Sequence, residues 1–219
     1  MTNRIADISQ RKAARVAGFG VLILVLAGSY LFFVLNSTLE GGIPGDAAVK
    51  AAKNIKANEL LLGIVIAIIL IMITCNVVVT LALYVLLKPV NKDLALLAVV
   101  IRLIYATIFA INMILLFIEP SSFSYVFLIG QIFYALHMLV LGYLVFKSGY
   151  IPRILGILLI IGGSVGYLIE VLTYFIFPNY LWIASLGIVV AVIAEIALAI
   201  WLLIKADKIP EMNPEIDSK

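Results

Sequence analysis

Six long apolar runs, nearly free of charged residues, constrain the fold of this chain more than any other feature. Each is at least as long as the roughly 20 residues that cross the hydrocarbon core of a bilayer as an α-helix. We therefore predict an all-α integral membrane protein whose single transmembrane domain, residues 1–219, is a bundle of six transmembrane helices. The predicted spans are 16–36, 60–87, 94–118, 123–146, 154–177 and 181–204, followed by a polar cytoplasmic tail over 205–219.

The composition leaves no room for a soluble domain. Of 219 residues, 65% are apolar and only 12% are charged, about half the roughly 25% of an ordinary soluble domain. Every functional group is therefore expected in or beside the bilayer. The net charge of +3 does not indicate a nucleic-acid partner, because the basic residues are spread over short loops and form no basic face interleaved with aromatic residues.

Basic residues are distributed unequally between the two sides of the predicted bundle. Only Lys50, Lys53 and Lys56 lie on the side opposite the amino terminus. The amino-terminal side has Arg4, Arg11, Lys12, Arg15, Lys88, Lys92, Lys147, Arg153, Lys205, Lys208 and Lys219. Because cytoplasmic loops carry the excess of Lys and Arg, both termini are predicted to face the cytoplasm of a prokaryotic cell, with the protein in its cell membrane. The first apolar run is too long for a signal peptide, so it is predicted to be a retained helix. Because it has no charged residue within it, it is predicted to pack on the outside of the bundle.

One loop is long enough to have a structure of its own. The segment 46–56 begins with Asp46, a good N-cap residue, and is rich in alanine. It predicts a short interfacial helix on the extracellular surface, between the first and second spans. Such a helix could be a simple connector or the lid of an outward vestibule, and the connector is the favoured interpretation.

Two strings of residues resemble a known family. They are 84–97, which reads YVLLKPVNKDLALL, and 142–155, which reads GYLVFKSGYIPRIL. With 44–48 and 178–180, they resemble a bacterial and archaeal membrane family catalogued as a domain of unknown function (DUF4386). The resemblance implies a compact six-helix membrane protein over nearly the whole chain and supplies no activity, substrate or cofactor. The resemblance also implies that many family members have an aspartate at the position of Asn76.

Polar side chains inside the spans are the candidate functional residues. A charged group at the bilayer centre costs about 2.5 to 3.5 kcal/mol on insertion scales, so Arg102, Glu170 and Glu195 must be paired, solvated or neutralised. At about 1.5 Å per helical residue, four groups fall at one level, roughly 13 to 16 Å from the cytoplasmic ends of their helices. These are Asn76, Arg102, His137 and Glu195.

A second polar level lies further out, and tyrosines lie between the two. The same arithmetic places Gln131, Glu170 and Asn112 roughly 24 to 26 Å from the cytoplasmic ends or slightly beyond. Tyr105, Tyr134 and Tyr167 fall between the levels. The third to sixth spans are predicted to enclose a polar, tyrosine-lined cavity that opens outward, with the second span closing one side. In the fifth span, Gly162, Gly163 and Gly166 are predicted to be close-packing residues.

These residues favour binding, or transport, of a small or amphipathic ligand that carries an anionic group. Arg102 would attract the anion, Glu195 would balance Arg102 when the ligand is absent, and His137 would gate by protonation. Glu170, Gln131, Asn76 and the three tyrosines complete the candidate site. The lipid bilayer is the expected partner, and the sequence does not predict an oligomeric state.

Two other classes stay open at this point. Arg102 and Glu195 could be a buried ion pair in a structural or partner-binding membrane protein. Alternatively Cys75, His137 and Glu195 could be nucleophile, base and orienting carboxylate of an intramembrane enzyme that acts on a lipid-like substrate. One cysteine and one histidine are too few for a typical metal or haem site, so no metal and no cofactor is expected.

Overall fold

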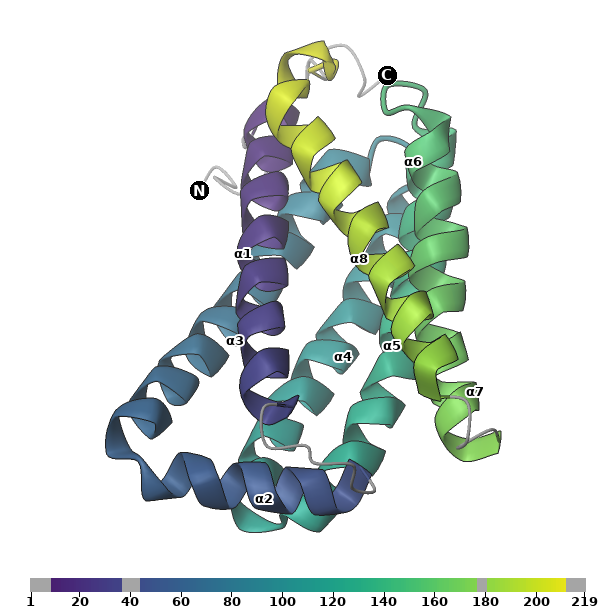
Figure 1. Ribbon diagram of the computed structural model, residues 1–219. Helices are drawn as coiled ribbons and strands as arrows, with labels where there is room; N and C mark the ends of the chain where they lie inside the picture. The colour runs from purple at the N-terminus through teal and green to yellow at the C-terminus, as the bar shows by residue number, and fades with distance from the viewer. Residues whose placement is uncertain (1–8, 37–43, 177–180, 212–219) are drawn as a thin grey trace.

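The computed structural model describes residues 9–36, 44–176 and 181–211, and these are helical apart from short connections (Figure 1). The helices are α1 (Gln10–Asn36), α2 (Pro44–Ala57), α3 (Glu59–Leu87), α4 (Lys92–Ile118), η1 (Pro120–Ser122), α5 (Phe123–Lys147), α6 (Arg153–Leu158), η2 (Leu159–Val165), α7 (Gly166–Ile176), α8 (Leu181–Ile204) and η4 (Ala206–Lys208). Of these, η1 and η4 are 3₁₀-helices and η2 is a π-helix.

Six helices in the described part of the chain are long and apolar enough to cross a membrane, as the sequence predicted. The first four are formed by α1, α3, α4 and α5, and the last by α8. The fifth is composite, because α6, η2 and α7 follow one another without a break from Arg153 to Ile176. The end of the predicted fifth span, Phe177, lies outside the described residues.

Asparagine side chains fix where two of the spanning helices begin. The Oδ1 atom of Asn58 accepts a hydrogen bond from the backbone N–H of Leu61 at 3.0 Å, and Oδ1 of Asn91 accepts one from Leu94 at 2.9 Å. Each caps a first turn whose N–H groups have no partner within the helix. An acidic residue follows each cap and favours the positive end of the helix dipole.

The distribution of polar and apolar side chains is that of a membrane protein. Large apolar residues face outward over the whole length of the bundle, for example Leu26, Phe33 and Ile118, each at least 70% exposed. Inside the bundle Arg102 is 1% exposed and Asn112 is 0% exposed. Since a soluble monomer rarely exposes large contiguous apolar patches, this surface fits lipid as its solvent.

The spanning helices form a closed ring, in which α1 packs between α3 and α8 (Figure 1). The order around the ring continues from α3 through α4 and α5 to the composite fifth span and α8. A Cβ atom at Gly18 of α1 would lie 2.7 Å from the carbonyl oxygen of Ala199, and one at Gly20 would lie 2.4 Å from Val79. The prediction that the first helix packs outside the bundle is therefore wrong, because these two glycines let it approach both neighbours closely.

The beginning of α1 and the end of α8 lie at one end of the bundle, here called the terminal end. Arg11 donates through Nε to the carbonyl oxygen of Ile209 at 3.0 Å, and Arg15 forms an ion pair of 2.8 Å with Asp207. Residues 205–211 thus fold back on α1, and Ile209 is completely buried. The assignment of this end to the cytoplasm stays a prediction from the distribution of basic residues.

Helix α2 lies across the opposite end of the bundle (Figure 1). Its buried face contains Ala48, Ala51, Ala52 and Ile55. The Lys56 ammonium donates to the carbonyl oxygen of Phe117 at 2.6 Å and so satisfies a carbonyl at the end of α4. The helical form expected for 46–56 is present and begins two residues earlier, at Pro44, a residue suited to a first helical turn.

Glycines bring the fifth and sixth spans into backbone contact. A Cβ atom at Gly166 would lie 2.4 Å from the carbonyl oxygen of Gly187, and a Cβ atom at Gly187 would lie 2.8 Å from that of Gly166. At Gly162 the nearest atom would be the Val190 carbonyl oxygen at 3.1 Å. The predicted close-packing role is confirmed, and it fits the use of small residues where lipid-embedded helices associate.

This contact predicts that Gly166→Ala destabilises the protein. The new methyl group would collide with the backbone of α8, and overpacking of this kind costs about 1 to 3 kcal/mol. Gly63→Ala is the matched control, since nothing lies within 4 Å of a Cβ atom there. Thermal unfolding in detergent should show a lower midpoint for Gly166→Ala and an unchanged or higher one for Gly63→Ala. Equal midpoints for the two variants would contradict the contact.

Candidate functional site

Arg102 of α4 is the centre of the polar interior. Its side chain is almost fully buried, and its Nη1 atom lies 3.0 Å from Nε2 of His137 on α5. The guanidinium carbon lies 5.5 Å from the centroid of the Tyr134 ring, within the range of a cation–π contact. The Nε and Nη2 atoms have no hydrogen-bond partner. The guanidinium is therefore only partly satisfied, although it lies at mid-depth of a spanning helix.

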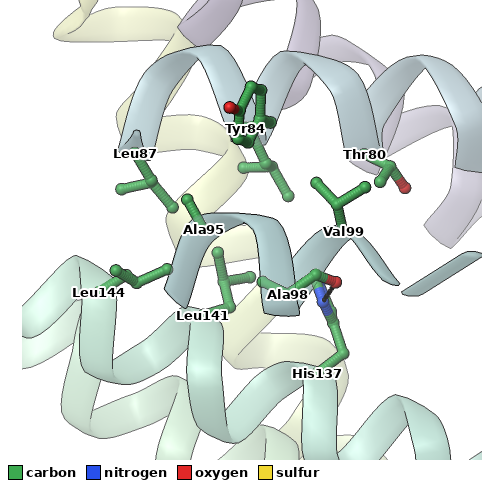
Figure 2. A pocket seen from close by; sticks show the side chains of 10 residues that line it. Thr80, Tyr84, Leu87, Ala95, Ala98, Val99, His137, Leu141 and Leu144 are labelled. Atoms are coloured by element: carbon green, nitrogen blue, oxygen red, sulfur yellow. Dashed lines mark hydrogen bonds between the residues drawn. The ribbon is translucent and has the colours of Figure 1, made fainter. Parts of the chain in front are cut away.

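The contacts of His137 define which nitrogen carries its proton. Its Nδ1 atom lies 3.0 Å from the carbonyl oxygen of Ala98, which can only accept (Figure 2). Its Nε2 atom faces Arg102, whose guanidinium can only donate. The proton must consequently be on Nδ1, and the ring is neutral. Protonation of Nε2 would put two donors face to face and break the bond between α4 and α5.

Glu195 of α8 is held by tyrosines and not by Arg102. Oε2 accepts a hydrogen bond from the Tyr134 hydroxyl at 3.0 Å, and Oε1 accepts one from the Tyr167 hydroxyl at 2.7 Å. The ion pairs among the described residues do not include Arg102 with Glu195. The expected ion pair is wrong for this conformation, because Tyr134 places its ring on the cation and its hydroxyl on the carboxylate.

The tyrosines fill the space where the sequence predicted a cavity. The ring centroids of Tyr105 and Tyr134 are 4.5 Å apart, and those of Tyr134 and Tyr167 are 5.0 Å apart. Tyr134 and Tyr167 are both buried. The predicted tyrosine-lined, outward-open cavity is thus replaced in this conformation by a packed tyrosine cluster, which consists of Tyr105, Tyr134 and Tyr167.

The second polar level, formed by Gln131 and Glu170, is also joined across helices. Nε2 of Gln131 on α5 donates to Oε2 of Glu170 on α7 at 2.9 Å. One turn further along α7, the Tyr174 ring meets the Tyr125 ring edge-on, with centroids 6.1 Å apart. Tyr167, Glu170 and Tyr174 therefore all face α5, as their helical spacing indicated.

Two buried asparagines stay apart from these groups. Nδ2 of Asn76 donates to the Met72 carbonyl oxygen in its own helix at 3.0 Å, and its Oδ1 atom has no partner. Neither polar atom of the Asn112 side chain has a partner, although the residue is fully buried. Asn76, which the sequence placed at the level of Arg102, thus shows no hydrogen bond to it. Such groups require water or a ligand to be satisfied.

A small cavity lies beside His137, between α3, α4 and α5 (Figure 2). It holds about 10 Å³, which is close to the space of one water molecule. Its walls are largely apolar and include Ala98 and Leu141, while Thr80, Tyr84 and His137 are the lining residues that carry polar groups. This space is too small for an organic ligand without movement of the helices.

Two polar residues with structural roles are not among the predicted site residues. Thr80 donates to the Asn76 carbonyl oxygen at 2.6 Å and lines the small cavity, and its spacing of four residues from Asn76 could have indicated a shared face. The Tyr150 hydroxyl donates to the Leu86 carbonyl oxygen at 2.6 Å and ties the loop after α5 to the end of α3. Burial raises the pKa of Tyr150 above its ordinary value.

No group of three or more His, Cys, Asp or Glu side chains able to hold a metal occurs within residues 9–36, 44–176 and 181–211. Cys75 is only partly buried. The polar interior instead consists of two hydrogen-bonded sets. Arg102, His137 and the Ala98 carbonyl form one, and Glu195, Tyr134 and Tyr167 form the other, with the Tyr134 ring between them.

Fold and site define a polytopic helical membrane protein with a buried polar interior. A family model described as "Domain of unknown function (DUF4386)" matches residues 16–119 and 120–206, so the chain belongs to this family, as its motifs indicated. The chain is also 36% identical over 144 residues to an uncharacterized protein of Archaeoglobus fulgidus, a match that covers 66% of this chain and 85% of the relative. No solved structure matches the chain.

The hydrogen bonds to Glu195 predict that Tyr167→Phe is destabilising. The substitution keeps the ring and removes one of two donors to a buried carboxyl group, which should cost about 1 to 2 kcal/mol in a membrane-embedded bundle. Tyr143→Phe is the control, because Tyr143 lies on the exposed face of α5. Combined with Glu195→Gln in a double-mutant cycle, Tyr167→Phe should show non-additive losses of unfolding free energy. Additive losses, or a loss no larger than that of Tyr143→Phe, would refute the contact.

Proposed function

We propose that the protein binds a small anionic group, carried by a solute or an amphipathic molecule, at Arg102 within the membrane. The observation that supports this proposal is the buried guanidinium with two unpartnered nitrogens, Nε and Nη2. These two belong to the planar donor set that binds carboxylate or phosphate oxygens in pairs. An ionisable group inside a span is by default a candidate functional group.

Charge balance favours an anion as the occupant. His137 is neutral in the observed hydrogen-bonding arrangement, and Glu195 is engaged by two tyrosine hydroxyls. Arg102 therefore has no carboxylate in direct contact, and its attraction for an anion is strong where the surroundings are apolar. Glu195 supplies the nearby negative charge that makes the empty site tolerable.

Ligand binding requires movement of Tyr134. Its ring lies on the guanidinium and its hydroxyl binds Glu195, so rotation of this one side chain uncovers the cation and frees the carboxylate. Protonation of His137 would release Arg102 from α5 and provide the gate. Transport follows if the bundle opens alternately to its two ends, with α2 covering the end opposite the termini.

The proposal is tested by thermal unfolding in detergent with a panel of simple anions: acetate, benzoate, octanoate and inorganic phosphate. An anion that binds only the folded state stabilises it by about 2.7 kcal/mol at 100 times its Kd. We expect at least one anion to stabilise the parent protein and Lys92→Gln, a control at the exposed start of the same helix. Arg102→Gln should lose this stabilisation, and Arg102→Lys, which keeps the charge, should retain part of it.

Two results would contradict the proposal. If no anion stabilises the parent protein, or if Arg102→Gln is stabilised as much as Lys92→Gln, the buried polar groups act only in structure. Should Arg102→Gln fail to fold, the comparison of Arg102→Lys with Lys92→Gln decides. Mass spectrometry of small molecules that copurify with the parent, but not with the Arg102 variants, identifies the native ligand.

A further inference from the structure

A groove on the outer surface of the bundle lies between α6 and α8, near the terminal end. It holds about 310 Å³ and is separate from the interior around Arg102. Apolar side chains form almost all of its wall, among them Leu155 of α6 and Ala197, Ile200 and Trp201 of α8. Ile200 and the neighbouring Ile204 are strongly exposed, so the groove opens to the hydrocarbon region that surrounds the bundle.

The shape of the groove fits a hydrocarbon chain. Ala197, Ile200 or Trp201, and Ile204 follow one another at intervals of three and four residues, so they line one face of α8 over roughly 10 Å of its length. The groove is open at Ala197 because this side chain is small, and Ile200 and Ile204 form the rim of the groove. This length along α8 corresponds to the part of one bilayer leaflet that lies next to the headgroups.

One cation lies where the groove reaches the end of the helices. Lys205 directly follows α8 and lines the groove, whereas Arg153, the first residue of α6, is not among the lining residues. The Arg153 guanidinium lies 5.7 Å from the centroid of the Phe146 ring. Lys205 is in no ion pair among the described residues. Trp201 lies one turn before Lys205, at the depth where tryptophan marks the membrane interface.

We propose that this groove is a binding site for an anionic phospholipid. The acyl chain lies along Leu155, Ala197 and Ile200, and the anionic headgroup is bound by Lys205. Charge complementarity selects this occupant, because a hydrocarbon-lined wall that ends in a cation matches an acyl chain that ends in an anionic headgroup. A lipid with a zwitterionic headgroup fits the wall equally well but gains less from Lys205.

Quenching of tryptophan fluorescence by brominated lipids tests the site. The chain has two tryptophans, so a Trp182→Phe background leaves Trp201 as the only reporter. The protein is reconstituted in mixtures of brominated phosphatidylglycerol with unbrominated phosphatidylcholine, and in the converse mixtures. The ratio of the two quenching curves gives the relative affinity for the anionic lipid. We expect a preference of at least about five-fold for phosphatidylglycerol, the effect of about one cation at a membrane surface.

Variants distinguish the groove from general attraction to the basic end of the protein. Lys205→Gln should reduce the preference to about one, while Arg153→Gln and Lys208→Gln, which remove cations outside the groove lining, should each preserve it. Ala197→Phe fills the groove and should reduce the quenching of Trp201 by both lipids. A parental preference near one, an unchanged preference in Lys205→Gln, or an equal loss in Arg153→Gln or Lys208→Gln would overturn the proposal. Unchanged quenching in Ala197→Phe would overturn the placement of the acyl chain.

Discussion

The hydrogen bond between Arg102 and His137 is the interaction on which the interior of this bundle depends. A guanidinium cannot lose its charge in a protein, so its burial in a membrane span has to be compensated by acceptors. His137 supplies one, and it can do so because the Ala98 carbonyl oxygen holds its proton on the other ring nitrogen. The same contacts join α4 to α5. Two guanidinium nitrogens stay unpartnered, and this incomplete satisfaction is the physical basis of the proposed anion site.

Glu195 contributes to this arrangement indirectly, through Tyr134. The carboxyl group binds two tyrosine hydroxyls, and one of these tyrosines covers the cation with its ring. Tyr134 thus contacts both the Arg102 guanidinium and the Glu195 carboxyl group and keeps the two apart. In an apolar surrounding a direct ion pair would neutralise Arg102 and leave nothing to attract a ligand. In the proposed anion site, this separation leaves the cation free for a ligand. Gly166 and Gly187 hold α7 and α8, which carry Tyr167 and Glu195, close together.

The sequence predicted the six helices, the helix between the first two spans and the family, because apolar length and local motifs depend on nearby residues alone. Rise per residue also gave the correct levels of Arg102 with His137 and of Gln131 with Glu170. Depth does not define the direction in which a side chain points, so Glu195 was assigned to Arg102 instead of to Tyr134 and Tyr167. The tyrosine cluster and the place of α1 depend on packing between distant segments, which no local pattern encodes. The link of Tyr150 to Leu86 was missed for the same reason.

The protonation state of His137 tests the account most directly. The chain has a single histidine, so ¹⁵N-histidine labelling of the tag-free protein in bilayers gives the signals of this ring alone. The account predicts a neutral ring at pH 7 with a directly bonded hydrogen on Nδ1 and none on Nε2. A hydrogen on Nε2, in either the other neutral tautomer or the doubly protonated ring, would show that the bond to Arg102 does not exist and would contradict the account.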